Sequence, residues 1–210
     1  DNLGTDLGPY LPDIYNVLYL IIENSANDET RVEAAKSLPP LIKIYKKTGQ
    51  DISQFCLHVN QTLWALMDRE SDPSTLAEFA FTIQKTLKNM GEVLSDAQLV
   101  EVYKKCLEHL QKSAARKQNL ADNFDKDEEN PQEVEDIIQG DNQLEDEFAL
   151  EIANVIGVLF KTYKQRSLPI FGQVMTDLII PASKDVRLKS KHFAMFLIDD
   201  AVEHIGEFIP

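Results

Sequence analysis

Four polar residues near the C-terminal end of the chain have the types and spacing that acid–base or metal chemistry uses: Asp199, Asp200, Glu203 and His204. Residues three and four apart share a helix face, so Asp200, Glu203 and His204 should be neighbours. Carboxylates beside an imidazole can transfer protons or hold a divalent cation. A metal site needs further ligands from other helices, and the sequence offers no second Glu-x-x-His pattern. We therefore favour a binding role, in which Asp199 and Asp200 pair with Lys or Arg side chains, over a metal-dependent hydrolase.

The rest of the sequence carries no recognised catalytic motif. There is no nucleophile elbow, no phosphate-binding glycine loop and no Cys–His cluster. Cys56 and Cys106 lie in apolar helical patterns, which favours buried free thiols over a disulfide or a metal site. Trp64, among leucines and a methionine, is predicted to be a core residue. We expect a non-catalytic protein without a cofactor or a metal.

A second cluster of charge is the acidic segment, residues 119–147, which carries twelve Asp or Glu residues against one Lys. It supplies -11 of the formal net charge of -14. Charge of one sign at this density cannot be buried, so the segment must lie in water or against a basic partner. A solubilising linker is the open alternative. The candidate partner-binding residues come from the two clusters: Asp125, Asp127, Glu128, Glu129, Glu133, Glu135, Asp136, Asp199, Asp200 and Glu203.

Part of the acidic segment has the signals of a short amphipathic helix. Asn130 can cap it, Pro131 suits the first helical position, and Val134, Ile137 and Ile138 form an apolar side. The pattern predicts a helix over residues 131–139 that ends at Gly140. Such a helix either docks on the rest of the protein or becomes ordered when a partner binds.

A small basic cluster follows later in the chain, at an expected helix start: Lys184, Arg187, Lys189 and Lys191. Four cations are too few for a nucleic-acid surface, and a pI near 4.7 also argues against binding to phosphate backbones. The cluster is either a solvated face or a dock for the acidic segment.

Composition places the chain among globular proteins. Its 210 residues are 43% hydrophobic and 27% charged, which is enough apolar material for a sizeable core. No apolar run approaches the roughly 20 residues of a membrane span, and the first residues do not resemble a secretory signal. The chain has no initiator Met, so we expect a piece of a longer protein.

The hydrophobic pattern recurs at three and four residues along most of the chain, which indicates helices. Pro39 and Pro40 should break one of them near Ser37, because proline cannot continue a helical hydrogen-bond ladder. No alternating strand pattern is present. We expect antiparallel helix pairs over residues 9–48, 51–91, 95–165 (with the acidic insertion, 119–147) and 167–206, with 207–210 starting a truncated further repeat.

Two-helix units spaced by about 40 residues are typical of an all-α solenoid of the HEAT or armadillo kind. In such a fold each pair buries its apolar face against its neighbours. The sequence therefore predicts an α-solenoid of about four HEAT-type pairs, wound as a right-handed superhelix, with the acidic insertion in the third pair.

Several stretches resemble a known family. DETRVEAAKSLPPLIKIYKK is similar to the second helix of a HEAT repeat, with a small Ala34–Ala35 pair where helices touch. IANVIGVLFKTYKQRSLPIFGQVMTDLI, followed by FAMFLIDDAVEHIGEFIP, resembles the C-terminal half of the importin-β (karyopherin-β) family. The importin-5, or karyopherin-β3, branch is the most similar. The family's N-terminal Ran-binding repeats are not evident in this chain.

The resemblance implies a fragment of a nuclear import receptor. Such a receptor binds basic cargo through nuclear localisation signals, is regulated by Ran-GTP and contacts FG-nucleoporins. It works in the cytoplasm, the nucleus and the nuclear pore complex, with no direct nucleic-acid binding and no membrane insertion. The alternative is a HEAT-repeat scaffold subunit of a multiprotein complex, such as a phosphatase regulatory subunit.

Overall fold

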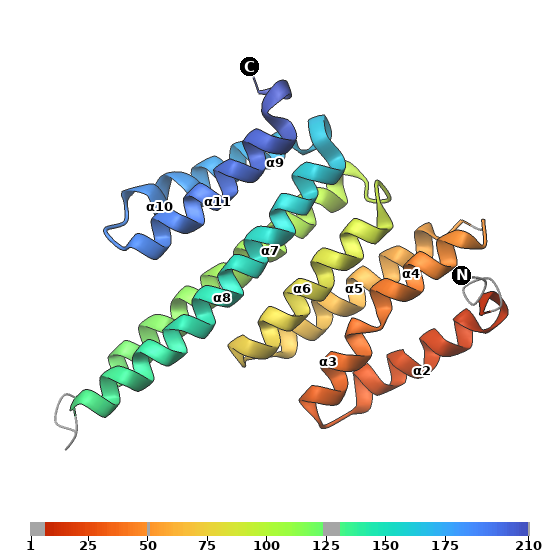
Figure 1. Cartoon of the computed structure of the whole chain (residues 1–210), viewed down its shortest axis with the longest axis horizontal. Helices are drawn as coiled ribbons and strands as arrows, with labels where there is room; N and C mark the ends of the chain where they lie inside the picture. Colours follow the sequence, from red (N-terminus) through yellow and green to blue (C-terminus); the bar gives the residue numbers. More distant parts are fainter. Residues whose placement is uncertain (1–6, 50, 124–130, 210) are drawn as a thin grey trace. The chain divides into compact units, whose positions relative to one another are not determined.

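The computed structural model describes residues 7–49, 51–123 and 131–209. Every regular element in these ranges is a helix and none is a strand (Figure 1), which confirms the predicted all-α class. No described helix is both long and apolar enough to cross a membrane. The chain divides into two compact units, Asp1–Ser95 and Asp96–Pro210, and each is described by itself.

The first unit is built from helices that follow one another along the chain, most of them antiparallel to the one before (Figure 1). A 3-10 turn, η1 (Gly8–Tyr10), leads into the first of them. The described α-helices are α2 (Leu11–Asn24), α3 (Asp28–Lys36), α4 (Leu38–Lys47), α5 (Ser53–Arg69) and α6 (Pro73–Met90).

The break predicted near Ser37 separates α3 from α4. Pro39 and Pro40 fall in the first turn of α4, where backbone N–H groups have no partner within the helix, so the missing donors cost nothing there. Farther into a continuous helix the same prolines would remove two hydrogen bonds. The sequence therefore starts a new helix instead of kinking one.

Side-chain caps begin two of the helices of this unit, α3 and α6. Asn27 caps α3, since its Oδ1 accepts a hydrogen bond from the Thr30 N–H at 2.8 Å. Gly91 ends α6 as predicted, with a φ of 71° that side-chain-bearing residues rarely adopt.

Salt bridges join helices of the first unit around a core that includes the buried Trp64 and the free thiol of Cys56, as predicted. Each bridge links groups that are distant in sequence, so the bridges help to fix how the helices pack. They are Arg31–Glu70 at 3.2 Å, Lys36–Glu78 at 3.1 Å and Arg69–Glu23 at 2.8 Å.

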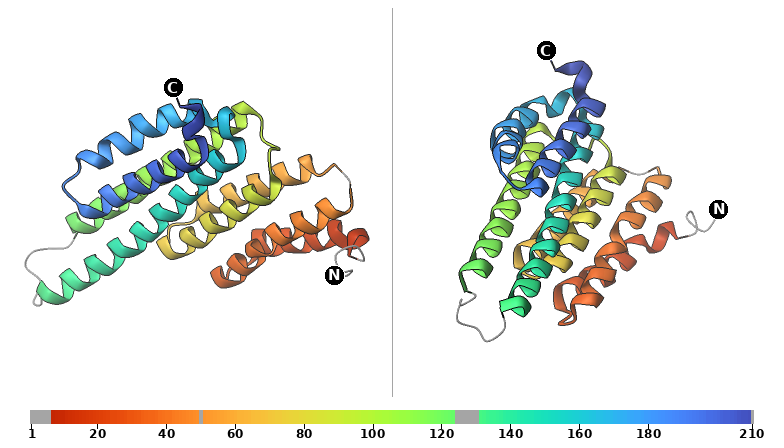
Figure 2. Two further views of the ribbon diagram at one scale, coloured as in Figure 1. Left: turned by 45° about the horizontal axis from the view of Figure 1, so that its top comes forward. Right: turned by 60° about the vertical axis from the view of Figure 1, so that its left-hand side comes forward.

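The second unit is dominated by two long antiparallel helices, with shorter elements along part of their length (Figure 2). The long helices are α7 (Asp96–Asn123) and α8 (Pro131–Tyr163). The shorter elements are η2 (Lys164–Ser167), α9 (Leu168–Val174), the π-helix η3 (Met175–Ile179), α10 (Ile180–Lys184), α11 (Leu188–Ile205) and η4 (Gly206–Phe208).

Gly140 does not end the helix that begins at Pro131. The predicted start is confirmed, but the predicted end is wrong because α8 continues to Tyr163. An isolated glycine costs a helix only about 1 kcal/mol. The apolar residues after it, Phe148 and Ile152 among them, are fully buried, and their burial outweighs this cost.

The helical stretch that contains Pro181 runs to Lys184 through a π-helical turn. Proline has no N–H with which to continue the ordinary ladder. The wider turn just before it compensates, since the N–H of Ile180 donates to the carbonyl of Met175, five residues earlier. In the same turn Asp177 accepts a hydrogen bond of 3.0 Å from the buried Tyr103 hydroxyl, which ties η3 to α7.

Candidate partner-binding site

The acidic segment lies where the two long helices of the second unit approach residues 124–130. Residues 119–123 belong to α7 and residues 131–147 to α8. These ends of α7 and α8 extend beyond α9, α10 and α11 (Figures 1 and 2). The described part of the acidic segment is therefore helical and carried on a two-helix projection.

Glu145 is an internal residue, although it belongs to the acidic segment. Its carboxylate is 4% exposed and accepts hydrogen bonds from Ser113 at 2.6 Å and from both Nε and an Nη of Arg116, the latter at 2.9 Å. The guanidinium in turn lies 5.8 Å from the ring centre of Phe148. A buried carboxylate needs such partners, so Glu145 fixes α7 against α8 and is not free for a partner.

Asp146 joins three helices. It is 24% exposed and pairs with Lys117 of α7 and, at 2.6 Å, with Lys189 of α11. Burial raises the pKa of its carboxyl, but hydrogen bonds from the two lysines outweigh burial and hold the pKa below the ordinary value. Lys189 belongs to the basic cluster, so this contact agrees with the interpretation of that cluster as a dock for the acidic segment.

The candidate residues of the acidic segment fall partly in the undescribed residues 124–130 and partly in α8. Asp125, Asp127, Glu128 and Glu129 lie outside the described residues. The backbone positions of Glu133, Glu135 and Asp136 lie in the first two turns of α8. Acidic residues there favour the helix, because the N-terminal end of a helix carries a partial positive charge.

The three candidates of the C-terminal cluster, all on α11, do not share one environment. Asp199 is exposed, and the Glu203 side chain is 66% exposed. Asp200 points instead at α8, where it lies against the backbone of Gly157: a Cβ added to that glycine would be 2.0 Å from Asp200 Oδ2. Asp199 and Glu203 are thus available to a partner, whereas Asp200 is part of the α8–α11 contact.

His204 extends this cluster without completing a metal site. Its Nε2 is 4.0 Å from Asp200 Oδ1, and its Nδ1 is 3.7 Å from Glu203 Oε1. The predicted common helix face is therefore present. Within the described ranges, no group of three His, Cys, Asp or Glu residues is arranged to hold a metal ion.

Burial raises the pKa of Asp200, and the negative charges of Asp199 and Glu203 raise it further, against the opposing effects of His204 and Lys161. A raised pKa means that the ionised carboxylate costs stability at neutral pH, and that this cost fades as the pH falls through the folded-state pKa. We expect Asp200→Asn to increase the free energy of unfolding at pH 7. The gain should vanish below about pH 4, the ordinary Asp pKa.

Urea unfolding of the wild type and the variant at both pH values measures this difference. Asp13→Asn, at an exposed position of α2, is the matched control. A gain of equal size at both pH values would contradict the burial of an ionised carboxylate.

The sequence matches the protein-family model described as Importin repeat 6 over residues 75–180, half of the chain. The chain belongs to the importin-β family. Members of this family are HEAT-repeat receptors of the karyopherin type, with roles in nucleocytoplasmic transport, and they are generally non-catalytic. The matched importin repeat contains all of α7, α8 and α9 and therefore the whole acidic segment.

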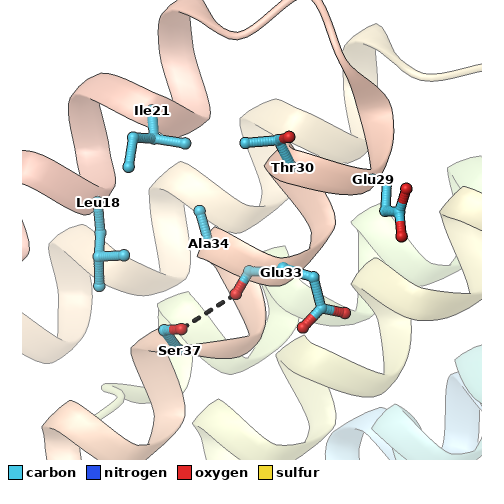
Figure 3. A pocket seen from close by; sticks show the side chains of 7 residues that line it. All are labelled: Leu18, Ile21, Glu29, Thr30, Glu33, Ala34 and Ser37. Carbon is cyan, nitrogen blue, oxygen red and sulfur yellow. Dashed lines mark hydrogen bonds between the residues drawn. The ribbon is translucent and has the colours of Figure 1, made fainter.

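A shallow groove in the first unit lies outside the matched importin repeat. It runs between α2 and α3 and has a volume of about 460 Å³. Leu18, Ile21 and Ala34 converge on it, while Glu29 and Glu33 lie along one side (Figure 3). Glu33 is already bound to Lys36 at 3.1 Å.

Sequence patterns missed two features of this importin-family chain. The groove joins residues of two helices whose apolar stripes look like ordinary core positions. The α7 partners of Glu145 and Asp146, which are Ser113, Arg116 and Lys117, lie 29 to 32 residues earlier in the sequence. The available signal for these partners was a surplus of Lys and Arg in residues 112–117, on the helix that pairs with α8.

Proposed function

We propose that this chain is the part of a nuclear import receptor that binds basic, lysine-rich cargo segments. The observation that carries the proposal is the position of the acidic segment, which lies inside the importin repeat and at the projecting end of the α7–α8 pair. Glu145 and Asp146 are bound within the unit, whereas Glu133, Glu135 and Asp136 lie nearer the N-terminal end of α8.

Charge supports this choice of partner. The segment holds -11 of the net -14, so a lysine-rich chain gains attraction without having to find a matching apolar surface. Complementary charge mainly increases the association rate and the selectivity, and both effects weaken as salt screens the charges. Exposed Asp199 and Glu203 on α11 add a second acidic position.

The finer family properties belong to the same proposal. The quoted C-terminal stretches support the importin-5, or karyopherin-β3, branch. In the intact receptor, Ran-GTP would release the cargo. The receptor would bind FG-nucleoporins as it passes through the nuclear pore complex between cytoplasm and nucleus. These partners act on the full receptor, so its complete chain is the material with which to test them.

Titration of the chain with a fluorescein-labelled decalysine peptide, followed by anisotropy, tests cargo binding. We expect binding at about 50 mM salt that weakens severalfold at about 150 mM. A decaglutamine peptide is the control for nonspecific association. Absence of decalysine binding at the lower salt would reject the cargo role and favour a HEAT scaffold.

Two sets of charge-neutralising variants locate the site. The triple variant Glu133→Gln, Glu135→Gln, Asp136→Asn should bind decalysine about tenfold more weakly at low salt, from roughly 0.5 kcal/mol per charge. The control Asp13→Asn, Glu29→Gln, Glu101→Gln removes the same charge from exposed positions elsewhere. Equal losses in both variants would show a diffuse effect of net charge without a site.

A further inference from the structure

The chain carries its own basic ligand for the acidic segment. The basic cluster Lys184, Arg187, Lys189 and Lys191 surrounds the turn between α10 and α11, and the Lys189 ammonium lies 2.6 Å from Asp146 of α8. The contact has the chemistry that a lysine of a basic partner would offer. A partner lysine that approaches Asp146 therefore meets a position that is already occupied.

The occupying lysine is poorly buried, which makes exchange feasible. The Lys189 side chain is 65% exposed, whereas Asp146 is 24% exposed and also holds Lys117. Another ammonium can replace Lys189 while Lys117 continues to neutralise part of the charge. Glu145 differs, because its 4% exposed carboxylate is enclosed by Arg116 and Ser113 and cannot exchange partners without unpacking α7 from α8.

The start of α11 has little else to hold it against α8. Val186 and Leu188 are 92% and 68% exposed, so they bury little apolar surface. The first buried residue of α11 is Ala194, and Leu197, Ala201 and Ile205 continue that buried face. Asp185 bonds to Arg187 and to Ser190 in the first turn of α11, but these contacts do not reach α8. Loss of the Lys189–Asp146 pair would therefore loosen residues 186–193 and leave the rest of α11 packed.

We propose that Lys189 is an internal competitor of the basic partner: it occupies Asp146 in the free chain, and a lysine-rich segment displaces it and releases the start of α11. The inference rests on the proposed function, because it assigns a regulatory contact to the same acidic segment. It also predicts that partner binding loosens the start of α11, away from the N-terminal end of α8.

Decalysine titration of Lys189→Ala and Lys191→Ala tests the competition. Both variants remove one positive charge from α11, but residues two apart point to nearly opposite sides of a helix, and Lys191 is exposed. We expect Lys189→Ala to bind decalysine about two- to fivefold more tightly than Lys191→Ala at low salt, the range for one partly exposed ion pair. Equal affinities would overturn the competition while leaving the proposed function intact.

Amide hydrogen exchange provides a readout that is independent of affinity. In the wild type, decalysine should accelerate exchange of the amides of residues 191–193, whose N–H groups donate to the preceding turn, whereas in Lys189→Ala these amides should already exchange fast without peptide. Unchanged exchange on binding would overturn the release of α11. If neither the wild type nor the two variants bind decalysine, the proposed function fails and this inference fails with it.

Discussion

Replacing Arg116 by Ala is expected to lower the free energy of unfolding of the second unit by about 3 kcal/mol. The substitution leaves the Glu145 carboxylate nearly buried with Ser113 as its remaining described hydrogen-bond donor. An uncompensated buried charge costs more than the lost ion pair contributes, because the carboxylate gave up its hydration on folding. Urea unfolding followed by circular dichroism measures the change.

Two further variants isolate the cause. Lys112→Ala removes a cation one helical turn earlier on α7, where the pair with Glu108 at 2.8 Å is exposed, and should cost less than about 1 kcal/mol. The double variant Arg116→Met, Glu145→Leu removes both charges and should recover most of the loss. If Arg116→Ala and Lys112→Ala cost the same, Glu145 is not a buried charge that depends on Arg116.

Gly157→Ala is expected to destabilise the second unit by about 1–2 kcal/mol, the usual cost of overpacking. The new methyl group would lie 2.0 Å from Oδ2 and 2.7 Å from Cγ of Asp200, so the carboxylate must turn away or α11 must move off α8. In the absence of this contact, a glycine-to-alanine change inside a helix is favourable. Thermal unfolding shows directly whether Gly157→Ala lowers or raises the melting temperature.

The same helix supplies the control for this substitution. Gly140 also lies inside α8, but a Cβ there meets no atom within 4 Å, so Gly140→Ala should stabilise by about 0.5–1 kcal/mol. Combining Gly157→Ala with Asp200→Ala removes the obstructing carboxylate and should reverse most of the loss. A stabilising Gly157→Ala variant would show that α11 is not seated on this glycine.

The sequence predicted the fold where local chemistry decides the structure. The new helix after Ser37 and the end of α6 at Gly91 follow from proline and glycine preferences. Prediction failed where packing overrides those preferences. Gly140 has the preference of a helix end, but the packing of α8 against α7 stabilises a helix that continues past it to Tyr163.

The acidic segment could be found from composition, but its members could not be distinguished. Glu145 and Asp146 stand next to each other with the same charge, yet one is enclosed by Ser113 and Arg116 and the other bridges to Lys189. Likewise, Asp199 and Asp200 are adjacent, and one faces water while the other faces Gly157. Such differences depend on which helix lies opposite, and helical spacing within one segment does not contain that information.

The ion pairs of Glu145 and Asp146 also set a mechanical limit on the acidic segment. Between Pro131 and Glu145, α8 rises about 21 Å at roughly 1.5 Å per residue. The first turn of α8 therefore acts as the end of a stiff lever, and the ion pairs of Glu145 and Asp146 form its pivot. A tilt of about 10° at the pivot would sweep the lever's end through about 4 Å, most of one helical turn. Small adjustments beside Lys117 and Lys189 can thus reposition the acidic residues toward partners of different shapes without any change in the helices themselves.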